Sequence, residues 1–293
     1  MRRVGLLAQG QFGNNLFVLS YALYALESAT VEVTIYTEST DFIFFCEKSQ
    51  ILEGKKLRVE NWPLWMKIYL RLYSKLLTRP KINHVNLIER LFRFKSFSSP
   101  WDIPTLSELN RWNMGYFQDA TPAIRVQQEL KNSFAKFSNF VFEKCINTEI
   151  ASLARNKSFT AVHLRRGDYR KIPEYGTISV EFTDLISLSK NSTLVVSSDD
   201  PRISSEFESW KDRINLVDVS HLSAIEALVI LADASKLYIS NSTFSWWIGF
   251  FAELRGNQVV SPIPWFKSAA VPKKFLQHPR FILKQAIFVQ NEN

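Results

Sequence analysis

Short apolar runs alternate with longer helical patterns along much of this chain, and the alternation predicts an α/β fold. RRVGLLA (2–8) reads as a buried strand, QGQFGNN (9–15) as a glycine-containing turn and LFVLSYALYALES (16–28) as a helix. VEVTIYT (31–37) alternates apolar and polar positions with the period of a strand. A strand, a turn, a helix and a second strand in this order are typical of a parallel-sheet unit.

The same alternation returns from about residue 150. The helical pattern there is HLSAIEALVILADA (221–234). The segments that read as strands are FTAVHL (159–164), STLVVSSD (192–199), KLYIS (236–240) and NQVVSP (257–262). We therefore expect two Rossmann-like domains, residues 1–150 and 151–293, the first with a mostly helical insert at about 60–135.

The segment NWPLWMKIYLRLYSKLLTRP (61–80) reads as a basic amphipathic helix, with Asn61 as its cap, Pro63 in its first turn and Pro80 as its end. Its basic residues recur every four positions, and its leucine and isoleucine residues also lie one turn apart: Lys67, Arg71 and Lys75, and Leu64, Ile68, Leu72 and Leu76. Two interpretations stay open. The helix packs against the protein, or it lies on an anionic membrane surface.

Composition narrows the class of protein. Of 293 residues, 46% are hydrophobic and 14% aromatic, which excludes global disorder. The net charge of +8 suits an anionic partner, such as a nucleic acid, a phosphate-bearing ligand or an acidic membrane surface. Two cysteines are too few for a disulfide framework, and no run of 18 apolar residues occurs, so we expect a chain kept in the cytoplasm.

The first stretch with chemistry is HLRRGDYR (163–170), which directly follows an apolar strand. Ligands of open α/β sheets bind beyond the carboxyl ends of the strands. A solvated turn with surface charges is one interpretation. The other is an anion site, because a guanidinium fork grips phosphate oxygens, while Gly167 eases the turn and Asp168 holds an arginine in place.

The second stretch is ISNSTFSWW (239–247), where small polar side chains leave a strand before two tryptophans. Hydroxyls and backbone N–H groups at a strand-to-helix turn bind phosphate. A simple helix cap followed by core aromatics explains the same pattern, so both interpretations stay open.

Other chemistries find little support. The four histidines have no metal-ligand spacing, and neither a D-x-D sequence nor a nucleophile motif is present. GQFGNN (10–15) lacks the third glycine of a dinucleotide fingerprint, and no P-loop occurs.

Together, GQFGNNLF (10–17), GYFQDATPAI (115–124), HLRRGDY (163–169) and NSTFSWW (241–247) make the chain resemble the bacterial type of α1,2-fucosyltransferases, glycosyltransferase family 11. Members of this family move fucose from GDP-fucose onto galactosides. The resemblance implies a GT-B-like α/β fold, with two Rossmann-like domains facing across a cleft and the nucleotide held mainly by the C-terminal one. It also implies catalysis without a metal or another cofactor.

The resemblance also implies roles for individual residues. Arg165 would neutralise the β-phosphate of departing GDP, and Asn14, from the other domain, would touch the same diphosphate. Further contacts to the diphosphate are implied for the hydroxyl cluster of Ser242, Thr243 and Ser245.

Three more residues belong to the expected donor site. His163 suits the guanine or ribose side of the nucleotide, and Glu226 would accept the guanine N–H groups, with a solvent-facing helix glutamate as its rival interpretation. Asp199 would fix the cleft or a nucleotide hydroxyl, with a helix cap as its rival.

Transfer should invert the anomeric centre. Asp168 and Glu174 are candidate bases, and Asp168 is equally a structural partner of arginine.

The expected partners are GDP-fucose and a galactose-terminated glycan, free or lipid-linked, with no nucleic acid. Peripheral contact with the inner face of the cytoplasmic membrane stays one of the two open interpretations of the basic helix. The expected setting is bacterial surface polysaccharide synthesis of the O-antigen type. The alternatives are a GDP-fucose transferase of another linkage or acceptor, and a non-catalytic protein that binds a nucleotide sugar or a nucleic acid.

Overall fold

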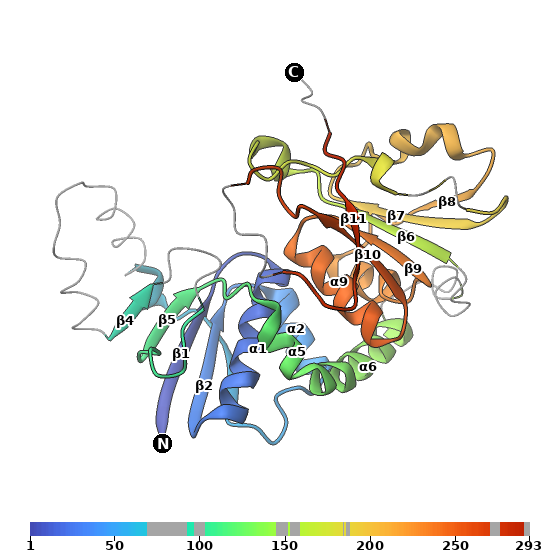
Figure 1. Cartoon of the computed structure of the whole chain (residues 1–293). Coiled ribbons are helices and arrows are strands. Elements are labelled where there is room, and N and C mark those ends of the chain that lie inside the picture. Colours follow the sequence, from blue (N-terminus) through green and yellow to red (C-terminus); the bar gives the residue numbers. More distant parts are fainter. Residues whose placement is uncertain are drawn as a thin grey trace. The chain divides into compact units, whose positions relative to one another are not determined.

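The computed structural model of the chain describes residues 1–68, 93–96, 103–144, 152, 159–183, 185, 188–269 and 276–289. These residues belong to two compact units, Met1–Leu130 and Lys131–Asn293 (Figure 1). Each unit contains one parallel sheet, and the two are described in turn.

The first unit is built on a sheet with the strand order β3-β2-β1-β5-β4, in which all neighbours are parallel. The strands are β1 (Arg2–Ala8), β2 (Val31–Thr37), β3 (Leu57–Asn61), β4 (Phe94–Ser96) and β5 (Trp112–Gly115). Its helices include α1 (Phe12–Ser28), α2 (Thr40–Lys48) and α5 (Ala120–Arg125). In Figure 1, α1 runs alongside β1 and β2, on which it packs.

The structure confirms both strands expected in this unit and corrects two other expectations. Helix α1 begins at Phe12, so the turn is shorter than expected, and FGNN (12–15) forms the first helical turn. The expected helical insert at 60–135 contains two sheet strands among its described residues, and β5 pairs with the central strand β1. Gly5 makes this pairing possible, because a side chain there would collide with the ring of Trp112.

The basic helix expected at 61–80 is described only at its start. Residues 64–68 are helical, and the carbonyl of Pro63 accepts the first helical hydrogen bonds. Asn61 ends β3 and is not the cap. Residues 69–80 lie outside the described part, so the rest of this helix stays a prediction.

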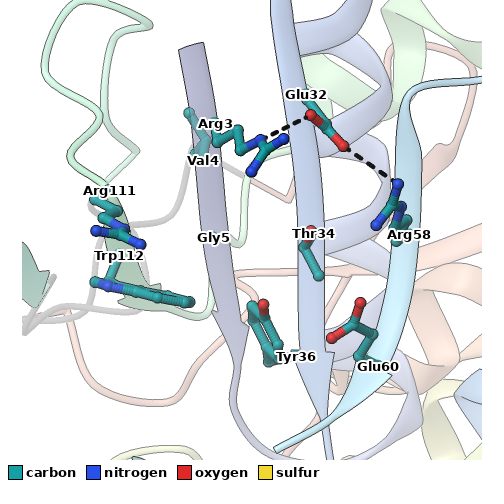
Figure 2. A pocket seen from close by; sticks show the side chains of 10 residues that line it. All are labelled: Arg3, Val4, Gly5, Glu32, Thr34, Tyr36, Arg58, Glu60, Arg111 and Trp112. Atoms are coloured by element: carbon teal, nitrogen blue, oxygen red, sulfur yellow. Dashed lines mark hydrogen bonds and ion pairs between the residues drawn. The ribbon is translucent and has the colours of Figure 1, made fainter.

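One face of the first sheet carries polar side chains around a small hollow (Figure 2). The carboxylate of Glu32 pairs with Arg3 at 3.1 Å and with Arg58 at 3.6 Å, which joins three strands. Both arginine side chains are largely exposed, so each pair contributes at most about 1 kcal/mol. The hollow has a volume of about 250 Å³, below the usual range of ligand pockets, and we assign it no ligand.

The second unit is built on a sheet with the strand order β11-β10-β9-β6-β7-β8, again with parallel neighbours. The strands are β6 (Phe159–Leu164), β7 (Thr193–Ser198), β8 (Asn215–Asp218), β9 (Lys236–Ile239), β10 (Gln258–Ile263) and β11 (Ile282–Gln285). Its helices include α8 (Ala224–Leu231) and α9 (Thr243–Leu254), with the short 3₁₀ segments η1 (Asp168–Lys171), η2 (Val180–Phe182) and η4 (Ile203–Trp210). All four expected strands and the expected helix are confirmed within three residues at each end, and the edge strands β8 and β11 were not expected.

The boundary between the units falls at 130/131, twenty residues before the expected position at 150/151. Most of helix α6 (Gln127–Lys144) therefore belongs to the second unit. Its Phe134 ring stacks on Phe251 of α9 at 4.0 Å, and the Arg255 guanidinium lies 4.7 Å from the same ring. Because these contacts lie between distant parts of the sequence, no local composition signal marks the boundary.

The central strands β6, β7 and β9 of the second sheet are buried on both faces, as expected of a parallel sheet, whereas the edge strands β8 and β11 are more exposed. On β6, Val162 and Leu164 join an apolar cluster with η2 and η4, while His163 faces the start of α9. Trp246 and Trp247 are fully buried, and the Trp246 indole N–H donates to the Leu276 carbonyl at 2.7 Å. The tryptophans of NSTFSWW are therefore core residues.

Two histidines are enclosed in this core. His163 lies against Ser245 and Phe244, and His278 lies among Trp246, Phe250 and Phe281. Burial lowers the pKa of each imidazole from 6.5 to about 4. Both side chains are therefore neutral in the folded protein at neutral pH.

We expect these histidines to make the protein acid-sensitive. Between about pH 6.5 and pH 4 the unfolded chain binds more protons than the folded one, so stability falls as the pH falls through this window. Each histidine should contribute about 3 kcal/mol to the loss. Urea unfolding at pH 7, 5.5 and 4.5 measures the slope. The variant His163→Asn should decline less steeply than the wild-type protein, and parallel slopes would contradict the assignment.

Candidate functional site

The two sequence stretches with chemistry come together at the carboxyl edge of the second sheet. Strands β6 and β9 are parallel neighbours, with His163 opposite Ile239. The turn after β6 and the turn after β9 therefore leave the sheet side by side. They are joined directly, because the Arg165 backbone N–H donates to the Ser240 hydroxyl at 3.0 Å.

A buried hydroxyl network shapes the turn after β9. Ser242 caps α9 by accepting the Ser245 backbone N–H at 3.1 Å. The Ser245 hydroxyl lies within 2.9 Å of the hydroxyls of Ser240 and Ser242 and 2.5 Å from His163 Nδ1. The Ser245 side chain is fully buried and holds the turn together, while Thr243, the first residue of α9, is half-buried at the helix N-terminus.

Asp199, at the end of β7, fixes the turn after β6. Its Oδ1 accepts the backbone N–H groups of Arg166 at 2.7 Å and Gly167 at 3.0 Å. A side chain at position 167 would collide with the Asp199 carboxylate, which explains the glycine. These hydrogen bonds alone account for the position of Asp199. Neither of the two expected roles, a helix cap or a nucleotide contact, is needed to explain it.

Arg165 lies at the surface of this turn between two carboxylates. Its guanidinium pairs with Asp168 at 2.8 Å and with Asp199 at 3.0 Å, and it lies over the Tyr169 ring. The side chain is 31% exposed, and that of Asp168 is 59% exposed. The site therefore presents a partly exposed, positioned cation whose outer partner faces solvent.

The next residue, Arg166, has the opposite surroundings. Its side chain is buried, pairs with Glu206 of η4 at 2.6 Å and donates to the Ile178 carbonyl. Consecutive residues that leave a strand point to opposite faces, so the two arginines separate. Arg166 is a structural residue that ties η4 to the turn.

His163 and Glu226 are engaged within the protein. His163 Nδ1 bonds Ser245, and burial keeps the ring neutral. Glu226 forms a capping box at the start of α8, accepting the Ser223 backbone N–H at 2.9 Å and hydroxyl at 2.7 Å. Glu226 is half-buried, and the capping box accounts for its position in the fold.

Asn14 belongs to the first unit, in the first turn of α1. Its neighbour Asn15 is buried and holds the glycine turn, because its Nδ2 donates to the carbonyls of Gly10 at 3.1 Å and Gln11 at 2.9 Å. Asn14 is half-buried, and its Oδ1 accepts a hydrogen bond from Gln118 Nε2 at 2.9 Å.

Three residues of these arrangements were missed as site residues in the sequence. Ser240 directly precedes NSTFSWW, and Gln118 lies in GYFQ, so their adjacency to motifs was a usable signal. Glu206 had none, because its pairing with Arg166 joins positions 40 residues apart.

Two searches of the described residues returned nothing. No three histidine, cysteine, aspartate or glutamate side chains there gather closely enough to hold a metal ion. Within the same part of the chain, no helix has both the length and the apolar character needed to cross a membrane.

Comparison with known proteins finds sequence similarity to a curated glycosyltransferase. The O-antigen biosynthesis glycosyltransferase WbnK of Escherichia coli is 25% identical over 164 residues, which cover 52% of this chain and 54% of WbnK. The match thus spans about half the length of that relative.

Solved structures support the fold. The E. coli heptosyltransferase WaaC with ADP has a TM-score of 0.51 at 11% identity, over 97% of this chain and 93% of WaaC. Fucosyltransferase NodZ from Bradyrhizobium has a TM-score of 0.42 at 12% identity, over 85% of this chain and 93% of NodZ. This TM-score is too low to support a conclusion. With its two parallel-sheet units, the chain has the α/β fold of GT-B glycosyltransferases.

The model of the family described as glycosyl transferase family 11 matches residues 81–274, which include GYFQ, HLRRGDY and NSTFSWW but not GQFGNN. More than half of the chain is thereby matched, and the chain belongs to glycosyl transferase family 11.

Proposed function

We propose that this chain is an inverting, metal-independent glycosyltransferase that moves L-fucose from GDP-fucose to the 2-hydroxyl of a terminal galactoside. The observation that carries the proposal is the Arg165 guanidinium, fixed at the carboxyl edge of the sheet and partly exposed. Membership of family 11 and the O-antigen assignment of the relative WbnK support the setting in bacterial surface polysaccharide synthesis.

Arg165 meets the main electrostatic demand of the reaction. When the bond from the sugar carbon C1 to the β-phosphate oxygen breaks, GDP leaves with the electron pair and gains negative charge. A positioned guanidinium stabilises that charge, and removal of one such group typically costs about 10²–10³ in rate. The N-terminus of α9, with Thr243 at its start, adds a helix dipole that favours an anion.

The other residues of the expected donor site fall into two groups: those that contact the donor and those that hold the turns in place. The capped turn at Ser242 is a proposed contact of the diphosphate in the second unit, and Asn14 of the first unit stays a separate candidate that rests on the family resemblance. Ser245, His163 and Asp199 act through the turns that they hold, because their polar atoms bond within the protein. Glu226 stays our candidate for the guanine edge.

The acceptor hydroxyl must lose its proton as its oxygen attacks C1. We propose Asp168 as the base, since its carboxylate is the more exposed of the two on Arg165. Arrival of the diphosphate at Arg165 would release this carboxylate for the proton. Glu174, which is exposed, is the second candidate.

We further propose that the chain touches an anionic membrane surface, where a lipid-linked acceptor would lie. Leu64, Trp65 and Ile68 expose 73%, 49% and 50% of their surface within little more than one helical turn. The sequence that follows adds Arg71 and Lys75 at the spacing of a basic helix.

Calorimetry with GDP-fucose, GDP-mannose, GDP and UDP-galactose, in buffer containing EDTA, tests the donor and the metal together. We expect GDP-fucose and GDP to bind, UDP-galactose not to bind, and transfer to a galactoside to proceed at an unchanged rate with EDTA. A rate loss of more than about tenfold with EDTA would contradict the metal-free reaction. Absence of GDP binding would favour the nucleic-acid-binding alternative, whereas GDP-fucose binding without transfer would favour a non-catalytic protein that binds a nucleotide sugar.

Arg165→Ala should lower the transfer rate at least about 10²-fold, and Arg165→Lys should recover little, because an ammonium lacks the planar fork. Arg202→Ala is the matched control, since Arg202 is 71% exposed after the neighbouring strand β7 and should retain wild-type transfer. Asp168→Asn should bind GDP at least as tightly as the wild type but transfer slowly. Retention of more than a tenth of the rate in Arg165→Ala would refute the role of Arg165.

Co-sedimentation with vesicles of phosphatidylcholine and phosphatidylglycerol tests the membrane contact. Replacing Leu64 and Trp65 by Ser should release the protein from anionic vesicles, because burial of these side chains drives the contact. The control replaces Ile282 and Leu283 by Ser on β11, which are 49% and 44% exposed. Equal co-sedimentation of both variants with anionic vesicles would contradict the proposed membrane contact.

A further inference from the structure

Asn241 lies just after the carboxyl end of β9, directly before the cap of α9, yet the function proposed above gives it no role. Its side chain is fully buried. The hydroxyls of the neighbouring serines bond one another, whereas the Asn241 amide points to a different segment. Its Nδ2 donates to the carbonyls of Tyr175 at 3.0 Å and Gly176 at 2.9 Å. The amide nitrogen thus holds two successive carbonyls of one loop.

The surroundings of this amide determine its orientation. Its nitrogen faces two carbonyl acceptors, whereas Asn241 Oδ1 is buried and has no hydrogen-bond partner among the described residues. A reversed amide would set its oxygen against both carbonyls. Position 241 therefore requires a donor, and a buried acceptor in its place would be unfavourable.

Residues 172–176, which follow η1, form the loop that Asn241 holds, and we call them the Glu174 loop. Other hydrogen bonds tie this loop to the segment after β10. The Lys267 N–H donates to the Tyr175 carbonyl at 3.1 Å, and the Ser268 N–H donates to the Glu174 carbonyl at 2.9 Å. The backbone of the loop is therefore held from two sides, by the turn after β9 and by the segment after β10.

The Glu174 loop packs beside the turn that carries Arg165. The Tyr175 ring contacts the Tyr169 ring at 5.2 Å, and the Arg165 guanidinium lies over that Tyr169 ring at 5.7 Å. On its other side, Tyr175 stacks on Phe266 at 4.6 Å. The Glu174 side chain is exposed, and its carboxylate has no hydrogen-bond or ion-pair partner within the described part of the chain. The loop thus presents an exposed carboxylate next to the proposed reaction centre.

We propose that Asn241 is a positioning residue for the acceptor: it holds the Glu174 loop so that the Glu174 carboxylate accepts a hydrogen bond from a hydroxyl of the galactoside. This inference rests on the proposed function and uses residues of the second unit alone. A displacement of about 1 Å can cost ~10²-fold in rate, so the loop must be fixed. Because Asp168 and Asp199 hold Arg165, the affinity for GDP should not depend on Asn241.

Asn241→Ala removes the two hydrogen bonds to the loop. We expect kcat/KM for the galactoside to fall about tenfold to a hundredfold, while the Kd for GDP stays within about twofold of the wild-type value. Hydrogen exchange of the backbone amides at 172–176 should become faster. Urea unfolding checks that the variant is folded under the assay conditions.

Asn257→Ala is the matched control. Asn257 Nδ2 also holds a backbone carbonyl, that of Ala232 at 2.9 Å, but this contact lies at the amino edge of the same sheet. The control variant should keep the wild-type kcat/KM and the wild-type exchange at 172–176. Equal losses of kcat/KM in the two variants would leave Asn241 with a structural role alone.

Asn241→Asp keeps the size of the side chain and makes its hydrogen bonding depend on pH. The ionised carboxyl would set an oxygen against the carbonyls of Tyr175 and Gly176, whereas the protonated carboxyl donates to one of them. Burial raises the pKa of a carboxyl, so the ratio of variant to wild-type kcat/KM should rise as the pH falls from about 8 to about 6. Asn241→Ala should show no such rise. A ratio that does not change with pH in Asn241→Asp would contradict the donor role of the amide.

Glu174→Ala tests the other end of the inference, and its exposed position makes loss of the fold no concern. It should lower kcat/KM for the galactoside about tenfold and leave GDP binding unchanged. The double variant with Asn241→Ala should lose no more than the more impaired single variant, because both changes remove the same contact. Wild-type kcat/KM in Glu174→Ala, or additive losses in the double variant, would overturn the positioning role.

The outcomes also separate this inference from the proposed function. If the wild-type protein neither binds GDP nor transfers fucose, the proposed function fails, and the role of Asn241 fails with it. If the wild type does both and Arg165→Ala loses transfer, while Asn241→Ala and Glu174→Ala behave like the wild type, only the role of Asn241 is lost.

Discussion

The Asp199 carboxylate is the interaction on which the candidate site depends. One oxygen accepts two successive backbone N–H groups, of Arg166 and Gly167, and the other pairs with the Arg165 guanidinium. The backbone of the turn and the direction of its key side chain are thereby set by one residue from the neighbouring strand. Hydrogen bonds to a charged acceptor are among the stronger ones in proteins, so the protein itself stabilises the conformation of the turn.

Two pairs of identical neighbours take opposite roles at the sheet edges. Arg166 and Asn15 are buried and bind within the protein, whereas Arg165 and Asn14 are partly exposed. In each pair the inner residue anchors the turn that presents the outer one. The same polar group thus serves as scaffold or as candidate ligand contact, depending only on the side of the chain to which it points.

Local patterns predicted most of the second unit correctly, because buried parallel strands such as Phe159–Leu164 are short apolar runs with clear ends. They did not predict β4 or β5, since Trp112–Gly115 is a strand through its pairing with β1 and β4, which are distant in the sequence. In the site, the motifs located Arg165 and the hydroxyl turn. The burial of Ser245 and Arg166 and the capping role of Glu226 depend on contacts between distant residues, which no local pattern encodes.

The pairing of Arg165 with both Asp168 and Asp199 has a consequence for how an anion enters. The Arg165 guanidinium is already paired with carboxylates. A diphosphate that binds to it therefore replaces a carboxylate as the counter-ion. The Coulomb energy gained with the diphosphate is partly offset by the loss of the ion pair between Arg165 and the displaced carboxylate. Association should therefore depend less steeply on ionic strength than the net charge of +8 suggests, and selectivity must come from geometry.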